Sequence, residues 1–182
     1  TSHLMYVQDG DSAAWYSTDA RPHQWTAGYT PDQVDERPLL PYRAGVRWVG
    51  DAAHAGLPAP ELAVRETRQT PDGVRVVAEL RSQRDADVLV LHTIGPALEV
   101  VARANGRASR PVRPTGDLPN EIRFYDPPAD GVVLELLLPR EQAMTVSDYT
   151  VGLADVPGMT TRPADLVRTP AHDGDLVVVV GR

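Results

Sequence analysis

The sequence has no cysteine, no lysine and no long apolar run, and each absence narrows what the chain can be. Without cysteine there is no disulfide framework, no thiolate zinc site and no cysteine nucleophile. The longest apolar stretches, such as the one around Glu135, fall far short of the roughly 18 residues that a membrane helix needs. We therefore expect a domain that folds around an ordinary hydrophobic core and does not itself span a bilayer.

The charge of the chain is biased toward the acidic side. All 18 basic residues are arginine, and 25 Asp and Glu outnumber them to give a formal net charge of −7. Such a balance argues against nucleic acid or an anionic lipid surface as a partner. The use of Arg in place of Lys is typical of a high-GC genome, so we attach no mechanism to it.

The length of 182 residues fits one domain, and a globule of this size buries roughly 70% of its unfolded surface without a metal or disulfide. Residues 1–5 resemble the remnant of a cleaved expression tag, so we predict a single β-sandwich domain over residues 6–182. No segment has the form of a signal peptide. If the natural protein is exported, we expect its export signal upstream of this sequence.

Short segments with a period of two predict the fold class. Apolar and polar residues alternate over strand-length stretches separated by Gly, Pro, Asp and Asn, which is typical of a sandwich or barrel. We expect an all-β, antiparallel, jelly-roll-like sandwich of about nine strands. The ten candidate segments for these strands are residues 5–8, 13–16, 61–69, 74–81, 87–94, 97–104, 121–125, 132–138, 145–151 and 176–180.

Helical signals are few, and they predict one or two short helices. Asp19 can cap a turn that starts near Pro22 and stops at Gly28, because Pro near the start and Gly past the end is the favoured order. Thr30 and Gln33 have the spacing of a capping box and predict a second helix start.

The sequence predicts no catalytic residue and no metal ligand. The histidines show no metal-binding spacing, and no serine lies in a G-x-S-x-G turn. His92 falls on the inner alternation of a predicted central strand, so we expect a neutral, hydrogen-bonded imidazole there. Carboxylates that converge only in the folded chain stay open as an alternative.

Three tryptophans are candidates for a binding surface. Trp15, Trp25 and Trp48 could form a stacking platform for a sugar, as aromatic faces do on many small sandwiches. Core packing is the alternative use of such large side chains. A platform requires at least two of the rings to be exposed on one face.

Both ends of the chain resemble one protein family. A strand and turn precede Trp15, and Asp19, Pro22, Trp25 and Thr26 follow in the pattern Asp-x-x-Pro-x-x-Trp-Thr; near the other end, residues 156–158 (Val-Pro-Gly) and Pro163 precede a valine strand over residues 176–180. These features resemble the region that follows the last membrane helix in polytopic zinc exopeptidases of the vacuolar membrane protease type.

The resemblance implies an architecture and a role. Members of this family have a zinc peptidase domain, transmembrane helices and a C-terminal β-rich domain on the extracytoplasmic side of the membrane, and this chain matches the last part. It implies a non-catalytic accessory domain without a cofactor of its own, with zinc in the parent peptidase domain. The implied partners are the parent peptidase and transmembrane domains, with peptides or envelope components as further candidates. The alternative is an extracellular carbohydrate- or protein-binding module.

Overall fold

The computed structural model describes residues 2–39, 43–115, 120–153, 156–167 and 175–181, and its regular structure is almost entirely strand. The only helix among these residues is α1 (Gln24–Ala27). The strands are β1 (Met5–Asp9), β2 (Ser12–Ser17), β3 (Asp32–Leu39), β4 (Arg43–Asp51), β5 (Glu61–Thr70), β6 (Gly73–Arg81), β7 (Val88–Thr93), β8 (Glu99–Ala104), β9 (Arg107–Ala108), β10 (Glu121–Tyr125), β11 (Val132–Leu138), β12 (Met144–Val151) and β13 (Leu176–Gly181).

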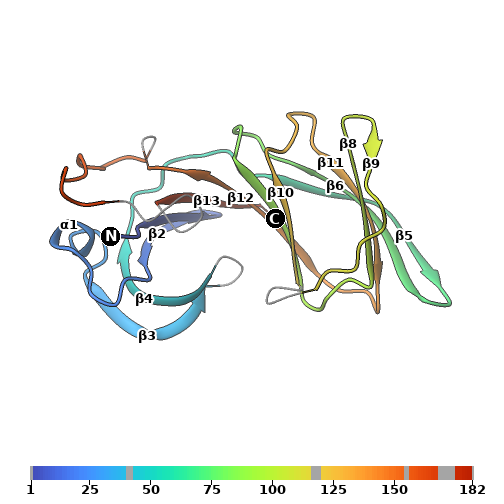
Figure 1. Cartoon of the computed structure of the whole chain (residues 1–182), viewed down its shortest axis with the longest axis horizontal. Coiled ribbons are helices and arrows are strands. Elements are labelled where there is room, and N and C mark those ends of the chain that lie inside the picture. Colours follow the sequence, from blue (N-terminus) through green and yellow to red (C-terminus); the bar gives the residue numbers. More distant parts are fainter. Residues whose placement is uncertain (1, 40–42, 116–119, 154–155, 168–174, 182) are drawn as a thin grey trace. The chain divides into compact units, whose positions relative to one another are not determined.

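The prediction of an all-β antiparallel sandwich is confirmed. The strands form an eight-stranded sheet in the order β10-β7-β12-β13-β1-β2-β4-β3 and a five-stranded sheet in the order β5-β6-β11-β8-β9 (Figure 1). Each predicted strand range overlaps a strand of the structure, and β1 pairs with β2 and β5 with β6 as antiparallel hairpins. Gly10, in the first of these turns, has a positive φ of 56°.

The region between β2 and β5 differs from the sequence-based expectation. The capping box predicted at Thr30 and Gln33 is wrong, because residues from Asp32 onward form β3, which pairs with β4. Helix α1 is present, but His23 caps it in place of Asp19: the His23 Nδ1 accepts the Trp25 amide at 3.1 Å. The Asp19 carboxylate instead accepts the His3 amide at 3.2 Å, a contact that no local pattern reveals.

The chain forms two compact units. Unit 1 comprises Thr1–Leu57 and Tyr149–Val179, and unit 2 comprises Pro58–Asp148 and Val180–Arg182, so the boundaries fall inside β12 and β13. Residues 2–5, interpreted from the sequence as a tag remnant, are buried in unit 1, and Leu4 and Met5 have no exposed surface. These residues are therefore part of the folded unit.

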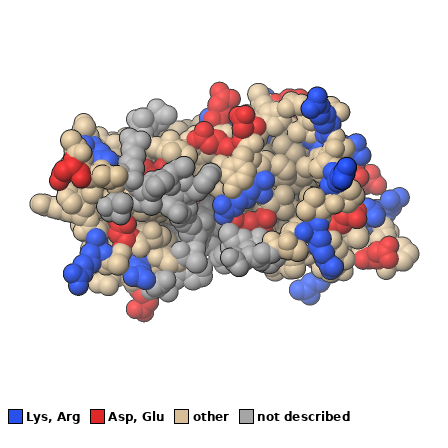
Figure 2. Space-filling view, viewed as in Figure 1, with Lys and Arg blue, Asp and Glu red and all other residues tan. Residues whose placement is uncertain are grey.

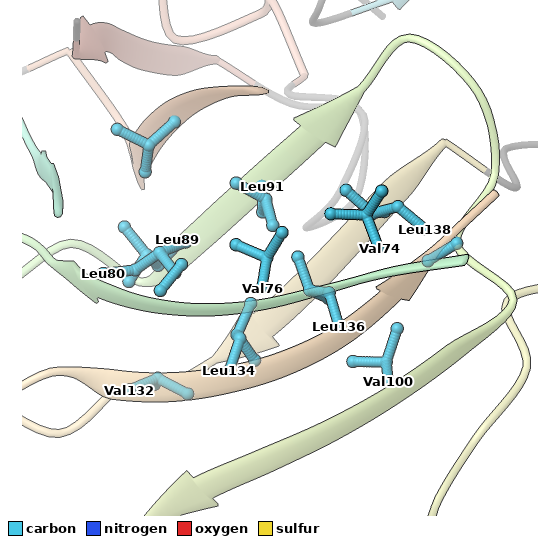
Figure 3. Close-up of a cluster of buried hydrophobic side chains, with 13 residues drawn as sticks. Val74, Val76, Leu80, Leu89, Leu91, Val100, Val132, Leu134, Leu136 and Leu138 are labelled. Carbon is cyan, nitrogen blue, oxygen red and sulfur yellow. The ribbon is translucent and has the colours of Figure 1, made fainter. Parts of the chain in front are cut away.

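The core of unit 2 is aliphatic. In β11 every second side chain is buried, and Leu134, Leu136 and Leu138 face the same way as Val76 and Leu80 of β6. Leu89 and Leu91 of β7 meet them from the other sheet (Figure 3). This face-to-face packing of two sheets is the sandwich arrangement, in which the hydrophobic effect stabilises both inner faces.

The core of unit 1 contains rings. Tyr6 of β1 and Trp15 of β2 lie directly opposite each other, and Val177 and Val179 of β13 pack in the same cluster. Val156 and Leu153 add side chains from the segment between β12 and β13. In Figure 1, β3 and β4 bend together beside this unit's other strands.

The outer face of the five-stranded sheet carries alternating charges. Arg65 pairs with Glu79 at 2.8 Å, and Arg103 pairs with Glu135 at 2.9 Å. Figure 2 shows basic and acidic side chains interspersed over the right-hand part of the view, where Figure 1 places β5, β6 and β8. Strand β5 is at one end of this sheet, and its pairing with β6 shifts register between Val64 and Glu66.

Candidate functional site

The three tryptophans predicted as a binding surface have three different environments. Trp15 is only 4% exposed and belongs to the core of unit 1. Trp48 is half-buried, and its Nε1 donates to the Asp19 carbonyl at 2.8 Å. Trp25 is half-buried and lines a pocket. The structure therefore presents Trp25 as the tryptophan of a candidate site, with Trp15 behind it.

A row of rings connects Trp25 to the core. The centroids of Tyr6 and Trp15 are 5.2 Å apart, those of Trp15 and Tyr29 are 5.1 Å apart, and those of Tyr29 and Trp25 are 5.3 Å apart. Tilted and edge-to-face contacts at such distances stabilise ring pairs beyond the area they bury. The Trp25 ring is therefore held on a rigid support.

Thr160 fixes the polar edges of two rings. The Trp25 Nε1 donates to the Thr160 Oγ1 at 3.0 Å, and the Tyr29 hydroxyl lies 2.8 Å from the same oxygen. The Thr160 amide donates back to the Tyr29 hydroxyl at 2.7 Å. These bonds attach the segment after β12 to α1 and the residues that follow it.

An ion pair forms the charged wall of the site. The Arg162 Nη2 donates to the Asp175 Oδ2, and the Arg162 Nη1 donates to the Ser2 hydroxyl. The other oxygen of Asp175 accepts the Leu4 amide at 3.2 Å. The Arg162 guanidinium also lies 4.6 Å from the centroid of the Trp25 ring, within cation–π range.

These groups surround a pocket of about 320 Å³ in unit 1. The other large side chains of its lining are apolar. Val151 lies at the end of β12, and Leu153 and Met159 come from the chain that follows this strand. Gly152 lies between them with a φ of 102°, a conformation that side-chain-bearing residues rarely adopt. The lining residues are Trp25, Val151, Gly152, Leu153, Met159, Thr160, Arg162 and Asp175.

Unit 2 contains a separate polar cluster around His92. The His92 Nε2 lies 3.2 Å from the Ser147 hydroxyl, and its Nδ1 lies 3.8 Å from the Glu121 carboxylate, which Arg123 also binds. Burial, with a smaller contribution from the Arg123 charge, lowers the pKa of His92 to about 4. The imidazole is therefore neutral at pH 7 and hydrogen-bonded, as the strand pattern predicted.

The order Ser147, His92, Glu121 resembles a catalytic triad in residue type, but its geometry does not suit nucleophilic attack. Ser147 has no exposed surface, so a substrate carbonyl has no path to its hydroxyl in this conformation. The 3.8 Å separation of His92 and Glu121 is also longer than the hydrogen bond that orients a catalytic imidazole. We interpret the cluster as a buried hydrogen-bonded network.

A second buried network of unit 2 surrounds Asp148. This carboxylate has no exposed surface; it accepts the Ser82 hydroxyl at 2.5 Å and the Arg84 Nε at 2.8 Å. Burial raises the pKa of Asp148, although Arg84 and Ser82 oppose that shift. The network fastens the residues after β6 to β12 within unit 2.

Among the residues that the structure describes, no group of three or more His, Cys, Asp or Glu residues is arranged to hold a metal ion. No helix in this part of the chain has the length and apolar character that crossing a membrane requires.

Sequence reasoning identified Trp25 but missed its neighbours in the pocket. Thr160 is 135 residues away from Trp25 in the chain, and Asp175 is 171 residues away from Leu4. Neither carries a local motif, so only the fold brings them together. Comparison of the chain with protein-family models, with curated proteins and with solved structures gives no match.

Proposed function

We propose that this chain is a non-catalytic accessory domain of a membrane-anchored zinc metallopeptidase, positioned on the extracytoplasmic side of the membrane. The observation that carries the proposal is where the two resembling segments lie in the fold. Tyr6 and Trp15 from one end of the chain and Val156, Val177 and Val179 from the other pack in the core of unit 1. Segments that resemble one family thus form one physical module.

The motif residues of the first segment also have structural roles in that module. Asp19 accepts the His3 amide and, through its carbonyl, the Trp48 indole. Trp25 lines the pocket, and Thr26 is fully buried in α1. A pattern whose Asp, Trp and Thr all contribute to one unit supports a shared fold better than the same residues scattered over a surface.

In this proposal the chemistry belongs to the parent peptidase domain, which would hold the zinc. The β-domain would position that domain and contact peptides or envelope components. Its net charge of −7 argues against a nucleic acid as a partner.

The upstream reading frame tests the proposal most directly. We expect it to encode transmembrane helices preceded by a peptidase domain with zinc-binding His, Asp and Glu residues. A reading frame that starts close to Met5, or that encodes no peptidase, would contradict the proposal.

An activity measurement tests the non-catalytic part. The purified chain, assayed with aminoacyl-nitroanilide and dipeptide substrates with and without added Zn²⁺, should release no product above a buffer control. Zinc-dependent turnover that persists through further purification and is abolished by EDTA would overturn this part.

A binding module for carbohydrate or protein is the second candidate function, and the pocket beside Trp25 favours it. Trp15 is buried, so the sugar version depends on the two half-buried tryptophans, of which Trp25 lines the pocket. A glycan array with the purified chain distinguishes a carbohydrate-binding module from a protein-binding one. Reproducible binding that Trp25→Ala removes would assign the pocket to a sugar.

A further inference from the structure

The polar groups of the unit 1 pocket are already bonded to one another. Thr160 Oγ1 takes the indole N–H of Trp25 and meets the Tyr29 hydroxyl. Asp175 uses one oxygen for Arg162 and the other for the Leu4 amide. A ligand that needs several new hydrogen bonds, as a sugar does, would have to break some of these.

The described residues that line the pocket carry no net charge. Among them Arg162 and Asp175 are the only ionisable groups, and they pair with each other. Their side chains are 12% and 5% exposed, so little of either charge faces solvent. A charged ligand group would therefore find no opposite charge without a partner of its own.

What the pocket offers a ligand is apolar surface. Val151, Leu153, Met159 and the Trp25 ring provide most of its lining. Val151 is 51% exposed at the end of β12, so apolar surface is present at the entrance. Methionine adapts its shape to different apolar groups more readily than branched side chains do.

The geometry points to this pocket as a binding site for one large apolar side chain, leucine- or phenylalanine-like, of a peptide. Its volume of about 320 Å³ is at the lower end of the range for ligand pockets, roughly 300–1,000 Å³, so it has room for one large side chain together with the backbone atoms beside it. Apolar surface buried there would drive binding, and the bonded polar groups would stay intact. The choice of a peptide as the source of the side chain rests on the proposed peptidase context.

Peptide titration followed by NMR tests this site on the whole chain. The probes are N-acetylated, C-amidated Ala-Xaa-Ala peptides in which Xaa is Leu, Phe, Ala or Glu. We expect the Leu and Phe peptides to shift the Trp25 indole N–H and the Thr160 amide saturably. The Ala and Glu peptides should bind at least tenfold more weakly, since burying a large apolar side chain is worth about 1.5–3 kcal/mol. Trp25→Phe assigns the indole signal.

A matched pair of variants locates the effect. Val151→Asp places a carboxylate at the pocket entrance and should weaken binding of the Leu peptide at least tenfold. Val167→Asp makes the same change at a 65% exposed position of unit 1 outside the pocket lining and should leave binding unchanged. Both positions are exposed enough that the fold should tolerate the charge, which circular dichroism checks.

Three results would overturn the inference: no saturable shift with the Leu or Phe peptide, equal binding of the Ala peptide, or unchanged binding in Val151→Asp. Saturable shifts with cellobiose and none with peptides would assign the pocket to carbohydrate instead. The experiments distinguish this inference from the proposed function. Peptide binding without an upstream peptidase would support the binding site and contradict the accessory role. An upstream peptidase without peptide binding would support the accessory role and contradict the binding site.

Discussion

The two units of this chain form their hydrophobic cores in different ways. Unit 2 is built from alternating aliphatic side chains on strands such as β6 and β11, and its core residues all come from the continuous range 74–146. Unit 1 joins both ends of the chain, and its core is a cluster of rings and valines beside buried polar groups. The core of unit 2 depends on the alternation of apolar and polar side chains along each strand, and the core of unit 1 depends on contacts between segments far apart in the sequence.

The two kinds of core packing also differ in the room they leave for a ligand. In unit 2 the aliphatic side chains of the two inner faces interdigitate and fill the space between the sheets at high density. In unit 1 the packing is less regular, and a pocket is present there. Trp25, the Arg162–Asp175 ion pair and Gly152, which has a positive φ, line it. The candidate site lies in the unit whose core is held by specific contacts.

The largest expected effect tests how far unit 1 depends on its ion pair. Asp175→Ala should lower the free energy of unfolding by about 4 kcal/mol, because it leaves the Arg162 guanidinium buried without its partner and removes the acceptor of the Leu4 amide. Urea denaturation followed by tryptophan fluorescence measures the loss, since all three tryptophans lie in unit 1. Asp165→Ala, at an exposed position of the same unit, is the control. A loss below about 1 kcal/mol would show that the ring cluster alone holds this unit.

A cavity in the aliphatic core should have the next largest effect. Leu134 has no exposed surface, so Leu134→Ala should lower the free energy of unfolding by about 3 kcal/mol. The adjacent Glu135→Ala, whose side chain points outward to Arg103, should change it by less than about 0.5 kcal/mol. Denaturation followed by far-UV circular dichroism compares the two variants. Similar losses in both would contradict the alternation on which unit 2 is built.

The pH dependence of stability tests the buried histidine of unit 2. Because the folded pKa of His92 is about 4 and the ordinary value is 6.5, the unfolded chain takes up this proton first. Stability is therefore lost as the pH falls from about 6.5 to about 4, and the loss ends below that. The shift corresponds to about 3 kcal/mol, which we reduce to about 2 kcal/mol because the 11% exposed side chain retains some solvent contact.

The measurement compares thermal unfolding of the wild type and His92→Gln between pH 7 and pH 4. The variant should lose about 2 kcal/mol less than the wild type over this interval. The raised pKa of Asp148 acts in the opposite direction but is present in both proteins, so it cancels in the difference. His54→Gln, at an exposed position, should follow the wild type. Parallel curves for wild type and His92→Gln would show that this imidazole is not kept neutral by the fold.

The smallest expected effect concerns the hydroxyl that supports Trp25. Tyr29→Phe removes the acceptor of the Thr160 amide and should lower the free energy of unfolding by about 1 kcal/mol. Tyr16→Phe is a suitable control, since its hydroxyl has no hydrogen bond among the residues that the structure describes. Equal unfolding midpoints for the two variants in urea would show that Thr160 is not anchored through Tyr29.

The sequence predicted unit 2 better than unit 1, for physical reasons. The bounds of β10 and β11 were predicted to the residue, because one alternation of the latter strand is fully buried. Strands β3 and β4 were missed, since β3 contains four charged residues and Pro38 and its pairing changes register twice. A proline in a strand is tolerated at a sheet edge, which is where β3 lies.

The candidate site was predictable only in part. Trp25 stood out as a large ring beside a helix signal, but Arg162 and Asp175 were not among the predicted site residues. Asp19 was expected to cap α1, yet its carboxylate binds the backbone of His3, in the segment interpreted as a tag remnant. Contacts between the two chain ends leave no periodic signal, so a single sequence does not reveal them.

The long β5 strand at the end of the five-stranded sheet affects how the protein should behave in concentrated solution. An edge strand has unpaired backbone N–H and C=O groups, which can pair with a strand of another molecule and start aggregation. Here the bulge between Val64 and Glu66 breaks the regular spacing, and Arg65 and Glu66 place charge beside it. This edge is thus poorly suited to growing an intermolecular sheet, which favours a protein that resists fibril formation.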